Sequence, residues 1–173
     1  MFMGYTFEEQ LKWGKAGEEV VIEFLRSKKE TEEVIDCSEQ KRFQSYGIDG
    51  LWVYTNQNTN LFEAIFFDVK TDYKCHKLNK LFIEVTAENL DGGILSTKAQ
   101  YFFYYDPYLG RLFQLSIYAI QRWYKEYGIS MKHVDVDNPS YATSGIVVDI
   151  DYLKQNFIIV EEFRVRKLNF EKV

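Results

Sequence analysis

The chain has 173 residues, a length typical of one domain that buries its own apolar core. Apolar residues make up 46% and aromatic residues 17% of the chain, which excludes intrinsic disorder because disordered chains lack the side chains to form a core. The net charge of −5 excludes nucleic-acid binding through bulk positive charge, so such a function would need locally clustered bases or metal ions beside clustered carboxylates.

Features of targeting and of oxidising compartments are missing from the sequence. The longest apolar runs fall short of the ~20 residues of a membrane span, and the first ten residues carry acids instead of a signal-peptide apolar stretch. Cys37 and Cys75 show no CxxC spacing and belong to no Cys/His cluster, which disfavours structural zinc and a disulfide framework. We therefore expect a single domain over residues 1–173 in a cytoplasmic, reduced protein that does not enter a membrane.

The first predicted element is an amphipathic helix over residues 5–29. Apolar side chains recur at steps of three and four, with Leu11, Val21 and Leu25 on the inward stripe. Glu18 lies on this same stripe, where an apolar side chain is expected. Glu19, one position further, is about 100° round the helix and is more easily solvated.

Strand patterns dominate the rest of the chain. Residues 48–55 and 61–70 are strong strand candidates joined by a polar turn of hairpin length, and the second is apolar on both faces, which is typical of a central strand. A second helix follows Ser116 and runs to about residue 127, with Tyr127 among its inward side chains. Further strands are expected at 33–37, 81–86, 101–105, 111–115, 145–150 and 157–160. This order predicts an α/β or α+β fold, with a mixed central β-sheet flanked by helices on both sides.

The predicted hairpin brings charged side chains to one end of the sheet. Asp49 begins the first strand and Asp68 lies near the end of the second, so an antiparallel pairing places them side by side. By alternation, Lys70 shares a strand face with Asp68. If the first helix packs on the face that carries Asp68 and Lys70, Glu18 points to the same place. We expect these four side chains to converge.

Such a cluster indicates a metal-dependent chemistry. Crowded carboxylates repel one another, and a hard divalent cation with oxygen ligands, Mg²⁺ or Mn²⁺, relieves that cost. The backbone carbonyl of Val69, between Asp68 and Lys70, is a further oxygen available to the ion. The ion would polarise a phosphoryl oxygen and lower the pKa of a bound water, which Lys70 would orient or help to deprotonate. The pattern therefore predicts phosphodiester hydrolysis by a metal-activated water.

These motifs resemble a known family. The run Gly47-Ile48-Asp49, with Asp68-Val69-Lys70 nineteen positions after Asp49, resembles the signature of the PD-(D/E)XK nuclease superfamily, which includes restriction endonucleases, Holliday junction resolvases and phage nucleases. The run Gly14-x-x-Gly17-Glu18-x-x-Val21 resembles the helix that precedes the signature in the resolvase-like branch. Two departures are Ile48, where Pro is common, and Asp68, where Glu is more frequent.

The resemblance implies a restriction endonuclease-like fold and a Mg²⁺-dependent deoxyribonuclease. Asp49 and Asp68 would be metal ligands together with the Val69 carbonyl, Lys70 the catalytic lysine and Glu18 an auxiliary acid. The implied partner is a nucleic acid, first of all DNA. A homodimer is also open, because many members of the superfamily dimerise to cut two strands.

Lysines near the predicted site are candidate phosphate contacts. Lys74 and Lys77 lie in the basic connection after the second hairpin strand, and Lys98 precedes an aromatic strand. A solvated loop explains the first two equally well, and a strand-edge charge explains Lys98.

Simpler interpretations of the motif stay open. Asp49 is also a suitable turn residue before a glycine, Asp68 and Lys70 also fit an ion pair at a strand end, and Glu18 could reach solvent past its neighbouring glycines. Two other functions follow from these interpretations. One is a catalytically inactive nuclease-fold module that binds or assembles, and the other is an unrelated α+β interaction protein whose motif is accidental.

Overall fold

The structure, a computed structural model, describes residues 7–87, 90–137 and 142–168. The helices are α1 (Phe7–Ser27), α2 (Lys41–Gln44), α3 (Cys75–Leu78), α4 (Gly93–Ser96), α5 (Ile117–Glu126) and α6 (Ile150–Gln155), with a 3₁₀ turn at Gly128–Ser130. The strands are β1 (Thr31–Asp36), β2 (Gly50–Asn56), β3 (Leu61–Thr71), β4 (Lys80–Ala87), β5 (Leu90–Asp91), β6 (Tyr101–Asp106), β7 (Arg111–Ser116), β8 (His133–Asp137), β9 (Ala142–Asp149) and β10 (Ile159–Arg164).

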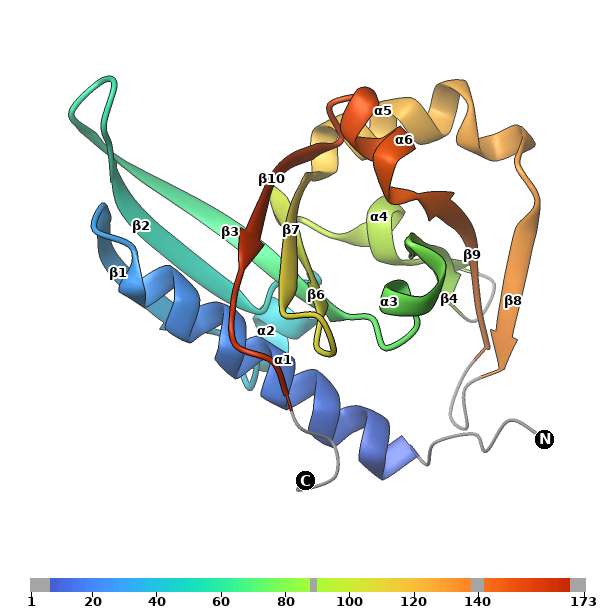
Figure 1. Cartoon of the computed structure of the whole chain (residues 1–173), viewed down its shortest axis with the longest axis horizontal. Helices are drawn as coiled ribbons and strands as arrows, with labels where there is room; N and C mark the ends of the chain where they lie inside the picture. The colour runs from blue at the N-terminus through green and yellow to red at the C-terminus, as the bar shows by residue number, and fades with distance from the viewer. Residues whose placement is uncertain (1–6, 88–89, 138–141, 169–173) are drawn as a thin grey trace.

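Within the described ranges the strands form two sheets (Figure 1). The main sheet has the order β1-β2-β3-β6-β7-β10, and it is mixed because β3 and β6 run parallel while its other neighbours are antiparallel. The smaller sheet has the order β5-β4-β9-β8 and is antiparallel throughout. The predicted α+β class with a mixed central sheet is therefore confirmed.

The main sheet is covered differently on its two faces. On one face, the apolar side of α1 packs against alternate residues of β2, β3 and β6, among them Trp52, Phe67 and Phe103. On the other face, Phe102 and Phe113 pack into a second core with the smaller sheet and α5. Helices therefore flank the sheet on both sides, as predicted, but the smaller sheet was not anticipated.

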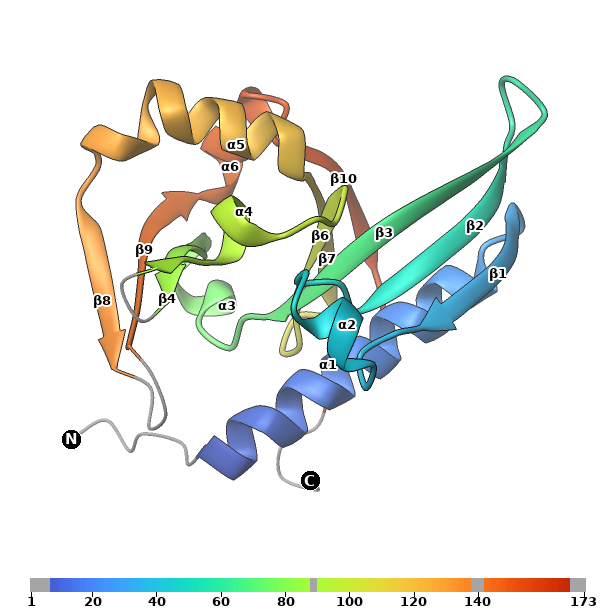
Figure 2. The ribbon, with the colours of Figure 1, turned by 180° about the vertical axis from the view of Figure 1, so that it is seen from behind.

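The β2–β3 hairpin extends beyond the body of the molecule as an arm, with its turn far from the smaller sheet (Figures 1 and 2). Pairing is regular from Asn56↔Leu61 at the turn to Gly50↔Phe67 at the base. Gly50 is the first residue of β2, so β3 has no β2 partner after Phe67, but it continues to Thr71 and pairs with β6 on its other side. The sheet thus splits at the residues that the sequence marked as the candidate site.

Most predicted elements are present, with boundaries displaced by a few residues. The first helix is Phe7–Ser27, and the expected start at residues 5–6 lies outside the described residues. Leu11 was predicted to be inward but is 63% exposed, because the helix extends beyond the end of the sheet at that turn. Tyr127 was also predicted to be inward but is 57% exposed, because α5 ends at Glu126 and the backbone of Tyr127 leaves the helical conformation. No helix in the described ranges has the length and apolar content to cross a membrane.

The approach of α1 to β3 depends on a glycine. A Cβ added to Gly17 would clash with the hydroxyl of Thr71 and lie 3.2 Å from its Cβ, whereas a Cβ on Gly14 would meet nothing within 4 Å. Of these two glycines, only Gly17 is therefore needed for the close packing of α1 on β3.

We predict that Gly17→Ala destabilises the fold by about 1–3 kcal/mol, since the neighbouring strand must shift. The matched change Gly14→Ala should stabilise it by up to about 1 kcal/mol, because alanine favours helix and the site is open. Urea denaturation of both variants measures the difference. Equal effects of the two substitutions would contradict the close approach of α1 to β3.

Candidate active site

Helix α1 delivers Glu18 to the end of β3. The close approach at Gly17 brings the next residue to the strand end, while Val20 and Val21 anchor the following turn in the core. Glu18 is half-buried and Glu19 is exposed, in agreement with the sequence-based expectation that Glu18 lies on the inward stripe. An acid is therefore held against the sheet where the packing would favour an apolar side chain.

Asp49 immediately precedes the first residue of β2, at the base of the hairpin. Its backbone N–H donates to the carbonyl of Phe67 at 2.9 Å, which continues the hairpin ladder by one bond. Its carboxylate Oδ2 then accepts from the N–H of Val69 at 2.7 Å, so the side chain replaces the missing strand. Because the N–H and C=O of a strand residue leave the backbone on the same side, the carbonyl of Val69 also points into this gap.

Asp68 and Lys70 project from the opposite face of β3 to the one that α1 covers. The expectation that the first helix packs on their face is therefore wrong, because the alternate residues Phe67 and Val69 supply the apolar face that α1 covers. Asp68 is 3% exposed, and its Oδ1 accepts from the Lys70 ammonium at 2.9 Å. The Lys70 Nζ also lies 5.7 Å from the centre of the Phe102 ring on the neighbouring strand. The lysine is thereby held at the edge of a buried carboxylate, with about a third of its side chain reaching solvent.

The carboxylates of Asp49 and Asp68 are close enough to affect one another. Burial raises the pKa of Asp68, the charge of Lys70 opposes that shift, and Asp49 adds to it through charge and a shared hydrogen bond, with a net value of about 7. Burial alone would lower the pKa of Lys70, but the charges of Asp68 and Asp49 raise it above its ordinary value. The site therefore holds a protonated lysine beside two crowded carboxylates.

Glu18 joins this cluster through Asp49. Burial and, after it, the nearby charge of Asp49 raise the pKa of Glu18 from 4.5 to about 7, and a hydrogen bond with Ser38 limits the shift. Asp49 thus interacts with Glu18 on the helix side and with Asp68 on the other side of the sheet. The four predicted residues Glu18, Asp49, Asp68 and Lys70 form one connected cluster.

Oxygen donors suited to a hard divalent cation meet at the split in the sheet. They are the carboxylates of Asp49 and Asp68 and the inward-pointing carbonyl of Val69. In the part of the chain that the structure describes, no group of three or more His, Cys, Asp or Glu side chains is arranged to hold a metal ion. A set of two carboxylates and one carbonyl is not such a group. The pKa of Asp68 is raised mainly by burial, and the charge of Asp49 adds to the shift.

The lysines predicted as phosphate contacts occupy different places. Lys74 and Lys77 are exposed at α3, after the end of β3. Lys98 is exposed between α4 and β6, and its N–H donates to the carbonyl of Tyr46 at 2.8 Å, three residues before Asp49. Lys98 therefore flanks the loop that leads into the site.

Two neighbours of the cluster were not anticipated. The charge of Glu84, on β4 of the smaller sheet, raises the pKa of Lys70, and Ser38, after β1, hydrogen-bonds Glu18. Glu84 lies in an ordinary alternating strand, and Ser38 lies in a polar turn, so neither has a motif. Only the packing of the smaller sheet and of the β1–α2 connection places them near the site.

Comparison with known proteins gives no match: no family model, curated protein or solved structure is significantly similar to this chain. The resemblance to the PD-(D/E)XK superfamily therefore depends on its short motifs and on the arrangement of their residues.

The raised pKa of Glu18 predicts a pH-dependent cost to the metal-free fold. An acid whose pKa is higher in the folded state contributes stability below its ordinary pKa of 4.5 and loses it as pH rises to about 7. Glu18→Gln should therefore match the wild type in stability near pH 4 and exceed it at pH 8, as measured by urea denaturation in a chelator. The exposed neighbour variant Glu19→Gln is the control and should show no such divergence. A constant difference across this range would contradict the proposed environment of Glu18.

Proposed function

We propose that this protein is a metal-dependent nuclease that hydrolyses phosphodiester bonds of DNA, with a restriction endonuclease-like arrangement of its sheet. The observation that carries the proposal is the meeting of Asp49, Asp68 and Lys70 at the base of the hairpin, where β3 extends past the first residue of β2. Buried acids beside a lysine are costly to a fold, and such groups are more common at functional sites than elsewhere. Asp68 and Lys70 are neighbours on β3, but Asp49 reaches them from another segment of the chain, which makes an accidental surface ion pair a poorer explanation.

The donors present fit Mg²⁺ or Mn²⁺. The carboxylates of Asp49 and Asp68 and the carbonyl of Val69 would hold the ion, since all are hard oxygen ligands. When bound, such an ion polarises a phosphoryl oxygen and lowers the pKa of a coordinated water.

The side chains of the chain supply the rest of the chemistry. The Lys70 ammonium, anchored by Asp68 Oδ1, would orient the attacking water and stabilise the negative charge that develops on the phosphoryl oxygens. Glu18, with a pKa of about 7, would accept or release a proton near neutral pH beside Asp49. A protonated Lys70 and a Glu18 that ionises near neutral pH support the roles that the resemblance implies for these two side chains.

One observation favours the alternative of a catalytically inactive nuclease-fold module that binds or assembles. Asp49 Oδ2 already accepts from the Val69 N–H, and Asp68 Oδ1 already accepts from Lys70. Each carboxylate thus has a partner within the protein. An active enzyme would bind a cation through the carboxylates of Asp49 and Asp68 and would cleave a phosphodiester. An inactive module would not cleave it.

The metal dependence of cleavage tests the proposed function. Linear, circular, single-stranded and branched DNA, with RNA of the same sequence, should be compared in Mg²⁺, Mn²⁺, Ca²⁺ and EDTA. We expect cleavage of DNA with Mg²⁺ or Mn²⁺. Ca²⁺ should raise the melting temperature without turnover, because it is larger and activates water poorly. Equal cleavage in EDTA would exclude the mechanism, and metal binding without any cleavage would favour the inactive module.

Substitutions of Asp68 and Lys70 should have separate effects. Asp68→Asn removes a metal ligand and should weaken Mn²⁺ binding in titration calorimetry, while the metal-free protein gains stability because a buried charge is removed. Lys70→Ala should keep metal binding but lower turnover by a factor on the order of 10² or more.

Asp135→Asn, an exposed acid on β8, is the matched control and should behave as the wild type. If Lys70→Ala cleaves DNA at the wild-type rate, Lys70 has no catalytic role and is only a charge at the end of a strand. Unchanged Mn²⁺ affinity in Asp68→Asn would place the metal elsewhere and remove the roles of Glu18 and Asp49.

A further inference from the structure

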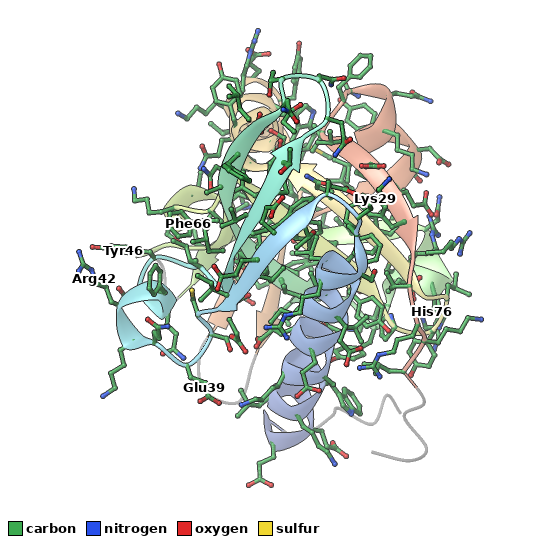
Figure 3. The ribbon with its side chains drawn as sticks, turned by 90° about the vertical axis from the view of Figure 1, so that its left-hand side faces the viewer. Lys29, Glu39, Arg42, Tyr46, Phe66 and His76 are labelled. Atoms are coloured by element: carbon green, nitrogen blue, oxygen red, sulfur yellow. The ribbon has the colours of Figure 1, made fainter. Side chains whose placement is uncertain are left out.

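An aromatic surface lies beside the candidate site, on the segment between β1 and β2 and on the neighbouring face of β3. Every side chain of α2 is exposed or half-buried, and Tyr46, two residues after it, is 43% exposed. The ring of Phe43 in α2 lies 6.0 Å from that of Phe66, centre to centre. Tyr46, Phe66 and Arg42 lie on the same side of the molecule (Figure 3).

This surface continues along one face of the hairpin arm. Alternation places Phe62, Ala64 and Phe66 on the face of β3 that carries Asp68, opposite the face that α1 covers. Phe62 is 75% exposed and Ala64 is also exposed, so the arm presents apolar side chains to solvent. We call Phe43, Tyr46, Phe62 and Phe66 the aromatic surface. It leads from the arm to a position two residues from Asp68.

The surface is held in place by backbone hydrogen bonds to the segment before β6. The N–H of Gln100 donates to the carbonyl of Phe66 at 2.8 Å, and the N–H of Lys98 donates to the carbonyl of Tyr46 at 2.8 Å. The hydroxyl of Thr97 donates to the carbonyl of Gly47 at 2.8 Å. The aromatic side chains therefore project from a braced loop whose arrangement exists before any ligand binds.

Positive charge accompanies the aromatic rings. Lys41 and Arg42 in α2 and Lys98 are all exposed around them. Of the nearest acids along the chain, Glu39 forms an ion pair with Lys15, and Asp36 accepts hydrogen bonds from Ser38. The chain carries a net charge of −5, so three exposed cations beside exposed or half-buried aromatic side chains are a local departure from its overall balance.

We propose that the aromatic surface binds a single-stranded segment of nucleic acid and leads it to the catalytic cluster. Bases stack on Tyr46, Phe66 and Phe62, and the backbone phosphates lie against Lys41, Arg42 and Lys98. Stacking requires an open base face, which duplex DNA offers only at its ends, so the surface selects single strands, flaps or frayed ends. This inference rests on the proposed nuclease function for its catalytic cluster, whereas the binding itself needs no metal.

The test is the affinity of the whole chain for a labelled single-stranded DNA oligonucleotide and for its duplex, by fluorescence anisotropy in EDTA. We expect tighter binding of the single strand. Tyr46→Ala should weaken it by about tenfold, the scale of losing one stacked base. Arg42→Ala should lower the steepness of the salt dependence by about 0.7 in log–log slope, the share of one phosphate contact on a single strand. Both residues are exposed, and thermal melting checks that each variant folds.

Tyr127→Ala and Lys125→Ala, which alter exposed residues at the end of α5, are the matched controls and should bind as the wild type. Preference for the duplex, or equal affinity of Tyr46→Ala and Tyr127→Ala, would overturn the inference. So would a dimer that Phe62→Asp dissociates without a change in DNA affinity, because a second copy would then cover the arm. Tyr46-dependent binding without cleavage in Mg²⁺ would contradict the nuclease function alone, whereas cleavage that is indifferent to Tyr46 would contradict the aromatic surface alone.

Discussion

The candidate site depends on the unequal lengths of two paired strands. β2 begins only at Gly50, opposite Phe67, whereas β3 continues to Thr71, and the bond from the Val69 N–H to Asp49 Oδ2 closes the gap beside the longer strand. A backbone N–H that faces away from water must find an acceptor, and here a carboxylate supplies it in place of a strand. A hydrogen bond that satisfies the fold therefore also brings a negative charge to the centre of the sheet.

Packing on both sides of this split gives the cluster its remaining members. Gly50 lies against the Phe67 ring, where an added Cβ would clash with the ring carbons, and Gly17 admits α1 onto Thr71. These two glycines let the helix and the hairpin close over β3. The parallel partner β6 then places Phe102 beside Lys70. The site is thus assembled where several elements approach more closely than larger residues would allow.

The cluster holds more acidic than basic side chains, and a bound cation would offset the difference in charge. Lys70 neutralises part of the charge of Asp68, but Asp49 and Glu18 add acids on the other side, and the pKa of both Asp68 and Glu18 rises to about 7. Groups that ionise near neutral pH respond to small changes in their surroundings. The same arrangement would let an arriving ion or phosphate alter the protonation of several side chains at once.

Local patterns in the sequence determined the main elements and the convergence of Asp49, Asp68 and Lys70, because alternation and hairpin pairing relate neighbouring strands directly. They also placed an acid on the buried stripe of the first helix. Only the tertiary structure decided the smaller sheet, the position of Glu84 near Lys70, and the bracing of the aromatic surface by the segment before β6. These depend on contacts between residues far apart in the chain, and short-range periodicity carries no information about such contacts.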